Sequence, residues 1–401
     1  MLHPDQARNI ILDHTPAGKT ILLPLNQIHG LILAQNLTAT SDLPLFDNSA
    51  MDGYAVRHAD LVEASTDHPV TLRNRGFVPA GLHETEQPGP GECYQIATGS
   101  EMPPGVDTVV MKESVTVAGT NIQFTRSPRL GDNVRYRGED IQHGQQILKT
   151  GMNLGPTQIA VLAAFGYAEV PVFQPLKVAI LSTGSELVNV EDPLAPGKIR
   201  DSNSHMFTAL VGSEHCAAWR LGIVEDRPDL LEQHLKKAMD ADMVLISGGV
   251  SVGDHDFVKD TLERLGVEEI FWKVSIKPGK PFFFGKKNET LVFGMPGNPA
   301  SSFVVFEEFV RPSIRKRMGR TPYVKPLVPA VLTEPVRHRA GRQQYLRAWL
   351  DRDCVPAQVR PMASQGSHSL NSLSEANALI VVESNSPEMP AGTVVSVRPV
   401  S

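Results

Sequence analysis

The sequence predicts a multidomain protein that combines a central, doubly wound parallel α/β domain with two regions made mostly of β-strands. From Lys177 onward, apolar strands alternate with amphipathic helices, in units of the length typical of βα repeats. Residues 57–145 contain short strands separated by Gly and Pro, which favours a mostly-β domain. Residues 325–401 contain a second set of short alternating strands, typical of a small barrel or sandwich. The predicted fold class is therefore α/β plus β.

The composition is that of an ordinary globular protein and excludes some functions. Of 401 residues, 41% are hydrophobic and 20% are charged, and the net charge of −6 does not favour bulk nucleic-acid binding. The three cysteines lie far apart and offer neither the spacing of a metal site nor a disulfide framework. Residues 1–10 lack the pattern of a secretory leader, and no apolar run approaches membrane-spanning length. We therefore expect a cytoplasmic protein with no membrane or nucleic-acid partner.

The first 45 residues and residues 146–175 are expected to form a helical N-terminal domain. Apolar positions between residues 1 and about 40 suggest helices, and residues 150–170 return to a helical pattern with Pro156 in the first turn. The mostly-β domain, residues 46–145, would then be inserted between two helical pieces. The α/β domain would span residues 176–322, and a C-terminal β domain, a barrel or a sandwich, residues 323–401.

Two polar segments of the inserted domain could bind a ligand. The turn that precedes the strand-like residues 54–56 contains Asp47, Asn48 and Asp52, although turn chemistry alone also explains these residue types. The segment 135–144 places two arginines beside Glu139 and Asp140. Such mixed charge is usually a solvated turn, but near an anionic ligand it would act as a clamp.

The α/β region has its polar residues where ligands of such folds bind. Strands are predicted at 178–183, 219–224 and 243–246, and helices at 201–211, 228–239 and 256–265, with a further helix reaching about residue 318. Ligands bind beyond the carboxyl ends of parallel strands. The residues at those ends are Glu186, Asp226, Asp254, Asp256 and residues 296–299.

The segment 247–260, SGGVSVGDHDFVKD, carries the strongest local signal. Glycines let backbone N–H groups approach an anion, and a helix N-terminus favours negative charge. Asp254 and Asp256 would repel a bare phosphate, so the loop predicts an anionic ligand together with a divalent cation. A simple Gly-Gly turn with Asp256 as N-cap is the alternative, but the convergence of polar residues at the strand ends favours a ligand site. The segment is neither a Walker A loop nor a GxGxxG fingerprint.

Eight motifs, in order along nearly the whole chain, resemble the molybdopterin molybdenumtransferase family, the MoeA-like proteins related to the E domain of gephyrin. They are DNSAMDGYAV, ATGS with PPGVDTVV, RGEDI, STGSEL, DSNS, SGGVSVGDHDFVK, KPGKPFFFG and GMPGNPAS. The resemblance implies an inserted β domain, a molybdopterin-binding α/β domain and a C-terminal β barrel. It also implies an elongated homodimer in which the active site is shared between subunits.

This resemblance implies a late step of molybdenum-cofactor synthesis. Members of the family insert molybdate into adenylylated molybdopterin with release of AMP, and use a divalent metal, usually Mg²⁺. The substrates would be adenylylated molybdopterin and molybdate, and a transient contact with the molybdopterin adenylyltransferase would supply the former. Lysines suit such oxyanions as compact point charges, and carboxylates would hold Mg²⁺ against the pyrophosphate.

The resemblance also assigns the site residues. The predicted catalytic residues are Asp52, Thr98, Asp140, Glu186, Asp226, Asp256, Lys273, Lys277 and Lys280, with Glu186, Asp226 and Asp256 as metal ligands. The predicted substrate-binding residues are Ser247, Gly248, Gly249, Gly253, Pro296, Gly297, Asn298, Pro299, Arg347 and Ser367. Two departures stand out: Ser185 replaces an acid that is frequent in the family, and His255 is unusual and could ligate a metal, although a solvent-facing helix start explains it more simply.

Three alternatives stay open at this point. A relative that adenylylates molybdopterin would share only the α/β domain. A scaffold protein, like the E domain of gephyrin, would act through its dimer and would need partner motifs. A phosphohydrolase on the same fold would release phosphate products without needing molybdate.

Overall fold

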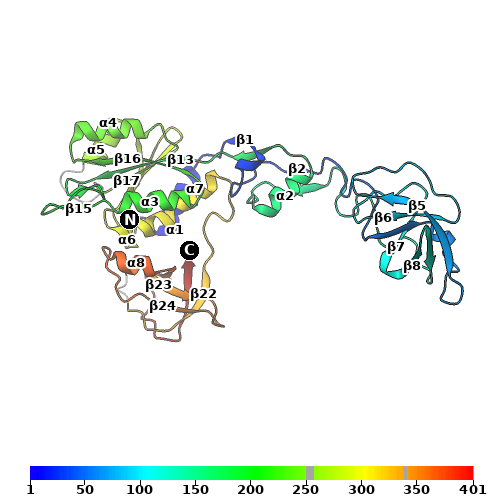
Figure 1. Cartoon of the computed structure of the whole chain (residues 1–401). Helices are drawn as coiled ribbons and strands as arrows, with labels where there is room; N and C mark the ends of the chain where they lie inside the picture. The colour runs from blue at the N-terminus through cyan, green and yellow to red at the C-terminus, as the bar shows by residue number, and fades with distance from the viewer. Residues whose placement is uncertain (250–256, 338–340, 401) are drawn as a thin grey trace. The chain divides into compact units, whose positions relative to one another are not determined.

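A computed structural model describes residues 1–249, 257–337 and 341–400, and the chain divides into two compact units (Figure 1). The first unit comprises Met1–Gln35, Thr150–Pro156 and Glu169–Ser401, and the second comprises Asn36–Lys149 and Thr157–Ala168. In chain order, the second unit is thus inserted into the first. The four domain boundaries expected from the sequence stay a prediction.

A six-stranded sheet forms the centre of the first unit. Its order is β16 (Ala217–Val224), β13 (Lys177–Thr183), β17 (Met243–Ser247), β21 (Thr290–Met295), β20 (Phe283–Lys287) and β18 (Glu268–Trp272). The first four strands are mutually parallel, as predicted, but β20 is antiparallel to both of its neighbours. Only two residues, Asn288 and Glu289, separate β20 from β21, and so short a connection can only reverse the chain. The sheet is therefore mixed at this side.

Helices cover both faces of this sheet, which confirms the doubly wound arrangement (Figure 1). On one face lie α1 (Pro4–His14), α3 (Asn203–Gly212), α6 (Pro299–Val305), the π-helical turn Phe306–Val310 and α7 (Arg311–Arg317); on the other lie α4 (Pro228–Ala238) and α5 (Phe257–Arg264). Alternate strand residues face opposite sides, so Ile180 packs under the first group and Leu181 under the second. Burial of each such side chain contributes about 1.5–3 kcal/mol.

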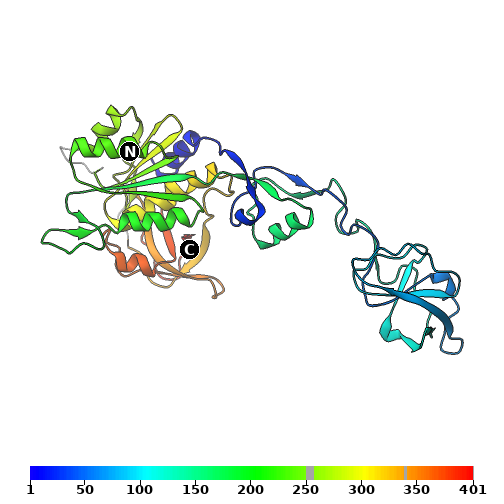
Figure 2. The ribbon, with the colours of Figure 1, turned by 45° about the horizontal axis from the view of Figure 1, so that its top comes forward.

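The C-terminal strands form a closed barrel, which decides between the barrel and the sandwich. Five strands follow one another as β23 (Gln343–Asp351), β24 (Gln358–Pro361), β22 (Val328–Leu332), β26 (Val394–Pro399) and β25 (Ala378–Val382), and β25 pairs back with β23. A short strand, β19 (Ile276–Lys277), is added to β23, and α8 (Leu370–Glu375) precedes β25. Tyr345 and Leu379 of the barrel belong to the same buried cluster as the α1/α3 face of the central sheet. The barrel and the α/β part therefore share a core (Figure 2).

The helical prediction for the first 40 residues is wrong beyond His14. Helix α1 ends there because Thr15 precedes Pro16, and a residue before proline disfavours the helical conformation. The chain continues as β1 (Thr20–Pro24), which pairs antiparallel with β12 (Glu169–Phe173), followed by a 3₁₀ turn at Leu25–Gln27. The helix predicted after residue 150 is present as α2 (Pro156–Ala164), with Pro156 at its start.

The second unit is mostly β, as predicted. Its six-stranded sheet has the order β7 (Thr108–Met111), β4 (Gly53–Val56), β6 (Glu92–Ile96), β5 (Val70–Val78), β9 (Asn121–Phe124) and β8 (Val115–Ala118). Two-stranded pairs join β10 (Val134–Arg135) to β3 (Asn48–Ser49) and β11 (Gln146–Leu148) to β2 (Leu37–Thr38), and short 3₁₀ turns occur at His58–Asp60 and Lys112–Ser114. Tyr54 and Ala55 point into different apolar clusters on opposite faces of the sheet. Both faces are thus packed.

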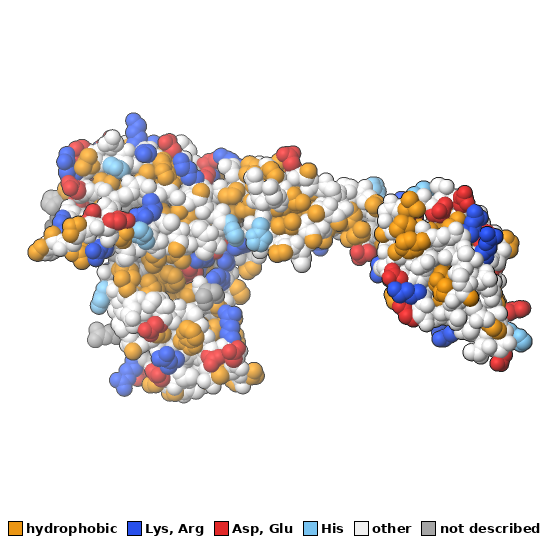
Figure 3. All heavy atoms as spheres, viewed as in Figure 1, with side chains coloured by type: hydrophobic (Ala, Val, Ile, Leu, Met, Phe, Trp, Pro, Cys, Tyr) orange, Lys and Arg blue, Asp and Glu red, His pale blue; other side chains and the backbone are white. Residues whose placement is uncertain are grey.

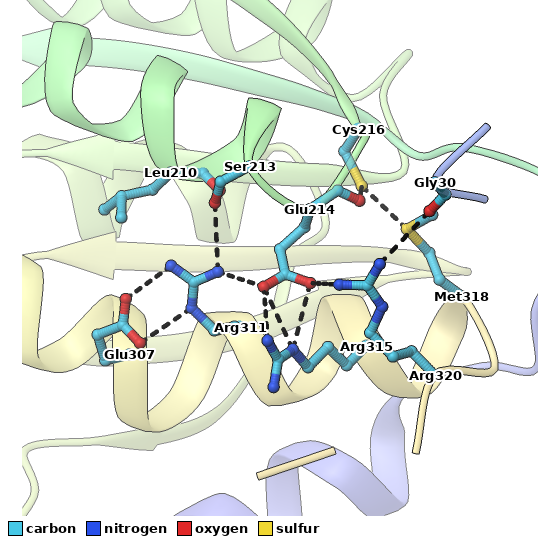
Figure 4. Close-up of polar contacts among 10 residues, drawn as sticks. All are labelled: Gly30, Leu210, Ser213, Glu214, Cys216, Glu307, Arg311, Arg315, Met318 and Arg320. Atoms are coloured by element: carbon cyan, nitrogen blue, oxygen red, sulfur yellow. Dashed lines mark hydrogen bonds and ion pairs between the residues drawn. The ribbon is translucent and has the colours of Figure 1, made fainter. Parts of the chain in front are cut away.

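A buried charge cluster ties α3 to α7 in the first unit (Figure 4). Glu214, which is 3% exposed, accepts hydrogen bonds from Arg311, from Arg315 (Nη2 to Oε1, 3.0 Å) and from Arg320 (Nη1 to Oε2, 3.1 Å). Arg311 also binds Glu307 through Nε and Nη2, at 2.9 and 2.6 Å. The carboxylate therefore links the loop after α3 to three arginines in and after α7.

The surface charge and the helix lengths are relevant to binding of nucleic acid and of membranes. Basic and acidic side chains intermingle over the face of each unit that Figure 3 shows. Among the described residues, no helix is both long and apolar enough to cross a bilayer.

Candidate functional site

A large cavity of about 1510 Å³ lies in the first unit, where the carboxyl ends of the parallel strands meet the barrel. Thr183, Ser247 and Pro296 line it from the ends of β13, β17 and β21, and Tyr345 lines it from the barrel strand β23. Its position is the one at which open α/β sheets bind ligands.

Most of the predicted site residues of this unit line that one cavity. They are Glu186, Asp226, Ser247, Gly248, Gly249, Lys277, Lys280, Pro296, Gly297, Asn298, Pro299 and Ser367. Two others, Lys273 and Arg347, do not line it. Gly253 and Asp256, together with Asp254 and His255, lie outside the described residues.

Two exposed carboxylates, Glu186 and Asp226, line the cavity just beyond β13 and β16. The backbone N–H of Ser185 donates to Asp226 Oδ2 at 3.3 Å, which orients that carboxylate. Among the residues that the structure describes, no three His, Cys, Asp or Glu side chains converge as a metal cluster. Mg²⁺ is nevertheless compatible with this pair, because it is usually held by one or two carboxylates together with water and substrate phosphates.

The glycine pair after β17 is required by close packing. Gly248 has φ +87°, and a Cβ at this position would lie 2.4 Å from the carbonyl oxygen of Thr183. Gly249 has φ +68°, and its Cβ would lie 2.4 Å from Val258 Cγ2 of α5. Because both the φ angles and the space exclude larger residues, the backbone runs directly against the end of β13. Packing within the protein therefore accounts for both glycines, and the approach of this loop to an anion stays a prediction.

The two lysines that line the cavity stand on a turn that links the barrel to the central sheet. Lys277 ends β19, which pairs with β23 of the barrel, whereas Lys280 precedes β20 of the central sheet. Between them, Gly279 has φ +110°, and a Cβ there would lie 2.6 Å from Val305 of α6. Both lysines are exposed. The turn therefore presents two cations to the same cavity as the two carboxylates.

Lys273 does not line this cavity, although the sequence placed it with the other two lysines. Its Nζ lies 4.0 Å from the ring centroid of Trp272, a cation–π contact. Its predicted catalytic role stays a prediction.

Arg347 binds the barrel loop that carries Ser367 into the cavity wall. The side chain is fully buried, and Nη2 donates to the carbonyl oxygens of Ser364 and Gly366, both at 3.0 Å. The next residue, Ser367, lines the cavity and accepts a hydrogen bond from Asn298 Nδ2 at 2.9 Å. Arg347 Nη1 has no hydrogen-bond partner in the described part of the chain, and burial lowers the pKa of the guanidinium.

The three remaining predicted residues belong to the second unit. Asp52 Oδ1 accepts hydrogen bonds from the backbone N–H and the hydroxyl of Thr98, both at 2.8 Å, and Lys112 Nζ lies 3.4 Å from Oδ2. The backbone hydrogen bond from Thr98 is the main reason why the pKa of Asp52 is lowered. The structure therefore brings Asp52 and Thr98 together. Asp140 is exposed, and its backbone N–H donates to the carbonyl oxygen of Leu43 at 3.1 Å.

Sequence reasoning missed several polar and charged residues of the cavity wall, among them Thr183, Arg200, Asn203, Glu334, Arg337 and Arg342. Asn203 stands in the DSNS motif, at the start of α3. A polar residue at the first position of a helix near the carboxyl edge of the sheet was the available signal, but capping explains such residues equally well. The neighbouring Asp201 does cap this helix, since its Oδ1 accepts the N–H of Ser204 at 3.0 Å.

Family models match the chain in three consecutive regions. Residues 2–166 match the MoeA N-terminal region (domain I and II), residues 179–316 a probable molybdopterin binding domain, and residues 329–400 the MoeA C-terminal region (domain IV). A molybdopterin molybdenumtransferase of Haemophilus influenzae is 38% identical, with 100% of this chain and 98% of the relative covered. The chain belongs to the MoeA family of molybdopterin molybdenumtransferases.

Further similarities extend over the whole MoeA architecture. A molybdopterin molybdenumtransferase of Bacillus subtilis is 35% identical, with 98% of this chain and 93% of the relative covered. Two solved structures of a molybdopterin biosynthesis MoeA protein from Pyrococcus horikoshii match with TM-scores of 0.88 and 0.84, at 29% and 31% identity, and each match covers 100% of this chain and at least 99% of the solved chain. The resemblance inferred from the motifs is thus confirmed, as is the multidomain fold class.

Proposed function

We propose that this protein is a molybdopterin molybdenumtransferase that inserts molybdate into adenylylated molybdopterin and releases AMP. The observation that carries the proposal is that Lys277 and Lys280 line the same cavity as the exposed carboxylates of Glu186 and Asp226, beside the glycine loop. Molybdate is a dianion and requires cations, whereas a substrate pyrophosphate requires a divalent cation between itself and the carboxylates. The family membership supports the same reaction.

In this proposal, the basic part of the cavity holds molybdate. Lys277 and Lys280 provide two positive charges on a turn fixed by the packing of Gly279 against α6. The Ser367 hydroxyl adds a donor, and Arg347 holds the loop that carries it. An oxyanion held in this way is oriented by groups that are in place before it binds, which lowers the entropic cost of the reaction. Lys273 is retained as a predicted contributor whose position lies outside the cavity wall.

Glu186 and Asp226 would hold Mg²⁺, with Asp256 as the predicted third ligand. When bound, the ion would neutralise the negative charge that develops on the departing phosphate. The backbone N–H of Ser185 orients Asp226, an interaction that does not depend on the side chain at position 185. Gly248 and Gly249 let the backbone pass tightly beside Thr183 and α5, and in this proposal its N–H groups would face the phosphates.

The second unit is proposed to complete the site within a homodimer. Asp52, Thr98 and Asp140 would act in an active site shared between subunits. In support, Asp52 and Thr98 are exposed, and hydrogen bonds within their own unit hold them in place. We further propose that the protein works in the cytoplasm and receives its substrate through transient contact with the molybdopterin adenylyltransferase.

The test is AMP release from adenylylated molybdopterin, measured with and without molybdate and Mg²⁺. Asp226→Asn should lower Mg²⁺-dependent release at least about 10–100-fold, the range seen even for groups that only support a metal ligand. Lys277→Ala should raise the molybdate KM about 10-fold or more, because one charged hydrogen bond is worth about 1.5–3 kcal/mol. Lys19→Ala is the matched control, since Lys19 is an exposed lysine of the same unit whose ion pair among the described residues is with the exposed Glu289.

The outcomes separate the rival functions. Release that is independent of molybdate, without formation of a molybdenum-loaded product, would favour a phosphohydrolase. A folded wild-type protein that binds substrate but releases no AMP under any condition would contradict the transferase and favour a scaffold.

A further inference from the structure

The amide of Asn203 is oriented by its two hydrogen bonds. Its Nδ2 donates to Ser247 Oγ at 2.9 Å and to the carbonyl oxygen of Gly297 at 2.7 Å. A backbone carbonyl can only accept, so the NH₂ end of the amide must face Gly297 and Oδ1 must face the other way. Asn203 thereby joins the loop after β17 to the loop after β21, and both of its N–H groups are used.

The oxygen of the same amide has no partner. Asn203 is 6% exposed and lines the cavity, yet its Oδ1 has no hydrogen bond among the described residues. The hydroxyl of Thr183, another cavity-lining residue that is 3% exposed, is also unpaired within the described part of the chain. A buried polar group without a partner costs about 1–3 kcal/mol, so two of them in one cavity wall call for an explanation.

The chemistry of these two groups limits the ligand that would satisfy them. Asn203 Oδ1 only accepts hydrogen bonds, so its partner must donate one. Molybdate and ionised phosphates are acceptors and cannot serve. Adenylylated molybdopterin does carry N–H donors of the right kind, because both its pterin and its adenine are pyrimidine-type rings with an exocyclic amino group. A hydroxyl such as that of Thr183 can donate to or accept from the adjacent ring nitrogen.

We infer that Asn203 is a specificity-determining residue whose Oδ1 accepts a hydrogen bond from the exocyclic amino group of an aminopyrimidine ring of the substrate, and that Thr183 is a second polar contact from the same cavity wall. This inference rests on the proposed function. The oxyanions are held by the lysine turn, whereas this wall selects the ring. A site built to bond a donor rejects analogues that lack it, because the buried acceptor is then left unpaired.

Asn203 also has a structural role, and the two roles use different atoms. The tether between the β17 and β21 loops uses Nδ2, whereas recognition uses Oδ1. Asn203→Leu removes both. Asn203→Asp keeps an acceptor oxygen in a side chain of the same shape but removes both donors, so the two variants separate recognition from tethering.

The experiment measures the affinity of the purified full-length protein for two matched ligand pairs by calorimetric titration. One pair is pterin and pteridin-4-one, which lacks the 2-amino group; the other is AMP and purine riboside 5′-monophosphate, which lacks the 6-amino group. Wild type should prefer the amino-bearing member of one pair by about 10-fold, the equivalent of about 1.4 kcal/mol. Asn203→Leu should abolish this preference and Asn203→Asp should retain it, while Thr183→Val should weaken binding of the amino-bearing ligand.

Ser204→Ala is the matched control. Ser204 is also buried with an unpaired hydroxyl, but it does not line the cavity, so the preference should be unchanged. The pair that shows the preference identifies the ring as pterin or adenine. Partial unfolding of a variant raises the apparent dissociation constants of both members of a pair by the same factor. The preference, which is their ratio, is therefore unaffected.

Three results would overturn the inference. The first is equal affinity of the wild type for both members of both pairs, and the second is a preference that survives Asn203→Leu. The third is a preference lost equally in Asn203→Asp and Asn203→Leu, which would indicate that Asn203 only tethers the two loops. Failure of the proposed function is distinguishable, since it would appear as absent molybdate-dependent AMP release in a protein that still discriminates between these ligands.

Discussion

Replacement of Glu214 by Gln should destabilise the first unit strongly. This carboxylate is 3% exposed and faces Arg311, Arg315 and Arg320 (Figure 4). Glutamine keeps the shape of the side chain but removes its negative charge. Within this described cluster, the three guanidinium groups then face a single carboxylate, that of Glu307, which binds Arg311. Removing one partner of a buried ion pair leaves uncompensated charge in a region of low polarity.

The expected loss is about 3 kcal/mol in the free energy of unfolding, at the lower end of the ~3–5 kcal/mol range for breaking a buried pair. The lower end applies because Arg311 retains Glu307, and because the Arg315 and Arg320 side chains are 12% and 22% exposed and can be partly hydrated. With about 2–4 °C per kcal/mol for a domain of this size class, the Tm should fall by about 6–12 °C.

Tryptophan fluorescence during thermal unfolding is the appropriate assay. All three tryptophans, Trp219, Trp272 and Trp349, belong to the first unit, so the signal reports that unit alone. Glu289→Gln is the control, because Glu289 forms an ion pair with Lys19 at 3.3 Å in which both side chains are more than 60% exposed. Such surface pairs contribute about 0–1 kcal/mol. A Tm shift for Glu214→Gln no larger than that of the control would refute the reasoning.

The same pair of proteins should differ in pH dependence. Burial raises the pKa of Glu214, but hydrogen bonds and charge from Arg315 and Arg311 outweigh burial, so the pKa lies below its usual value of 4.5. A carboxyl whose pKa is lowered by folding adds stability above its unfolded pKa, and this stability is lost as the pH falls through the folded pKa. The Tm gap between wild type and Glu214→Gln should therefore be full at pH 7 and shrink below about pH 4.5. A gap that stays constant on acidification would contradict the ion-pair explanation.

Three further predictions concern the glycine loop, the thiols and the metal. Gly248→Ala should lower AMP release and reduce the free energy of unfolding by about 1–3 kcal/mol, because φ is +87° and the Cβ would meet the Thr183 carbonyl. Gly212→Ala, at the end of α3, is the control: its Cβ would lie in open space, so it should be neutral or stabilising in the same assays. Burial raises the pKa values of Cys93 and Cys216 to about 12, so iodoacetamide at pH 8 should modify neither in the native protein, and mass spectrometry should find both labelled only after denaturation. Chelation with EDTA should abolish AMP release without changing the Tm, and Mg²⁺ should restore it; activity that persists in EDTA would argue against a metal.

The sequence alone determined the α/β repeat, the mostly-β insertion and the family. Strand and helix periodicity is a local property that reflects burial, and the structure has β13, β16 and β17 with α3 and α4 close to where the pattern placed them. The glycine pair after β17 and the polar strand ends were also predictable, because chain order alone places the ends of parallel strands at one edge of the sheet.

Only the tertiary structure decided the features that depend on distant parts of the chain. Pairing of β1 with β12 overrides a helical pattern, and pairing of β25 with β23 closes the barrel. In both cases the sequence near a strand does not indicate which distant strand it will pair with. The same holds in the site. The structure separates Lys273, over Trp272, from Lys277 in the cavity wall, although only four positions divide them. It also leaves Asn203 Oδ1 unpaired, because whether a buried polar atom finds a partner depends on every element packed around it.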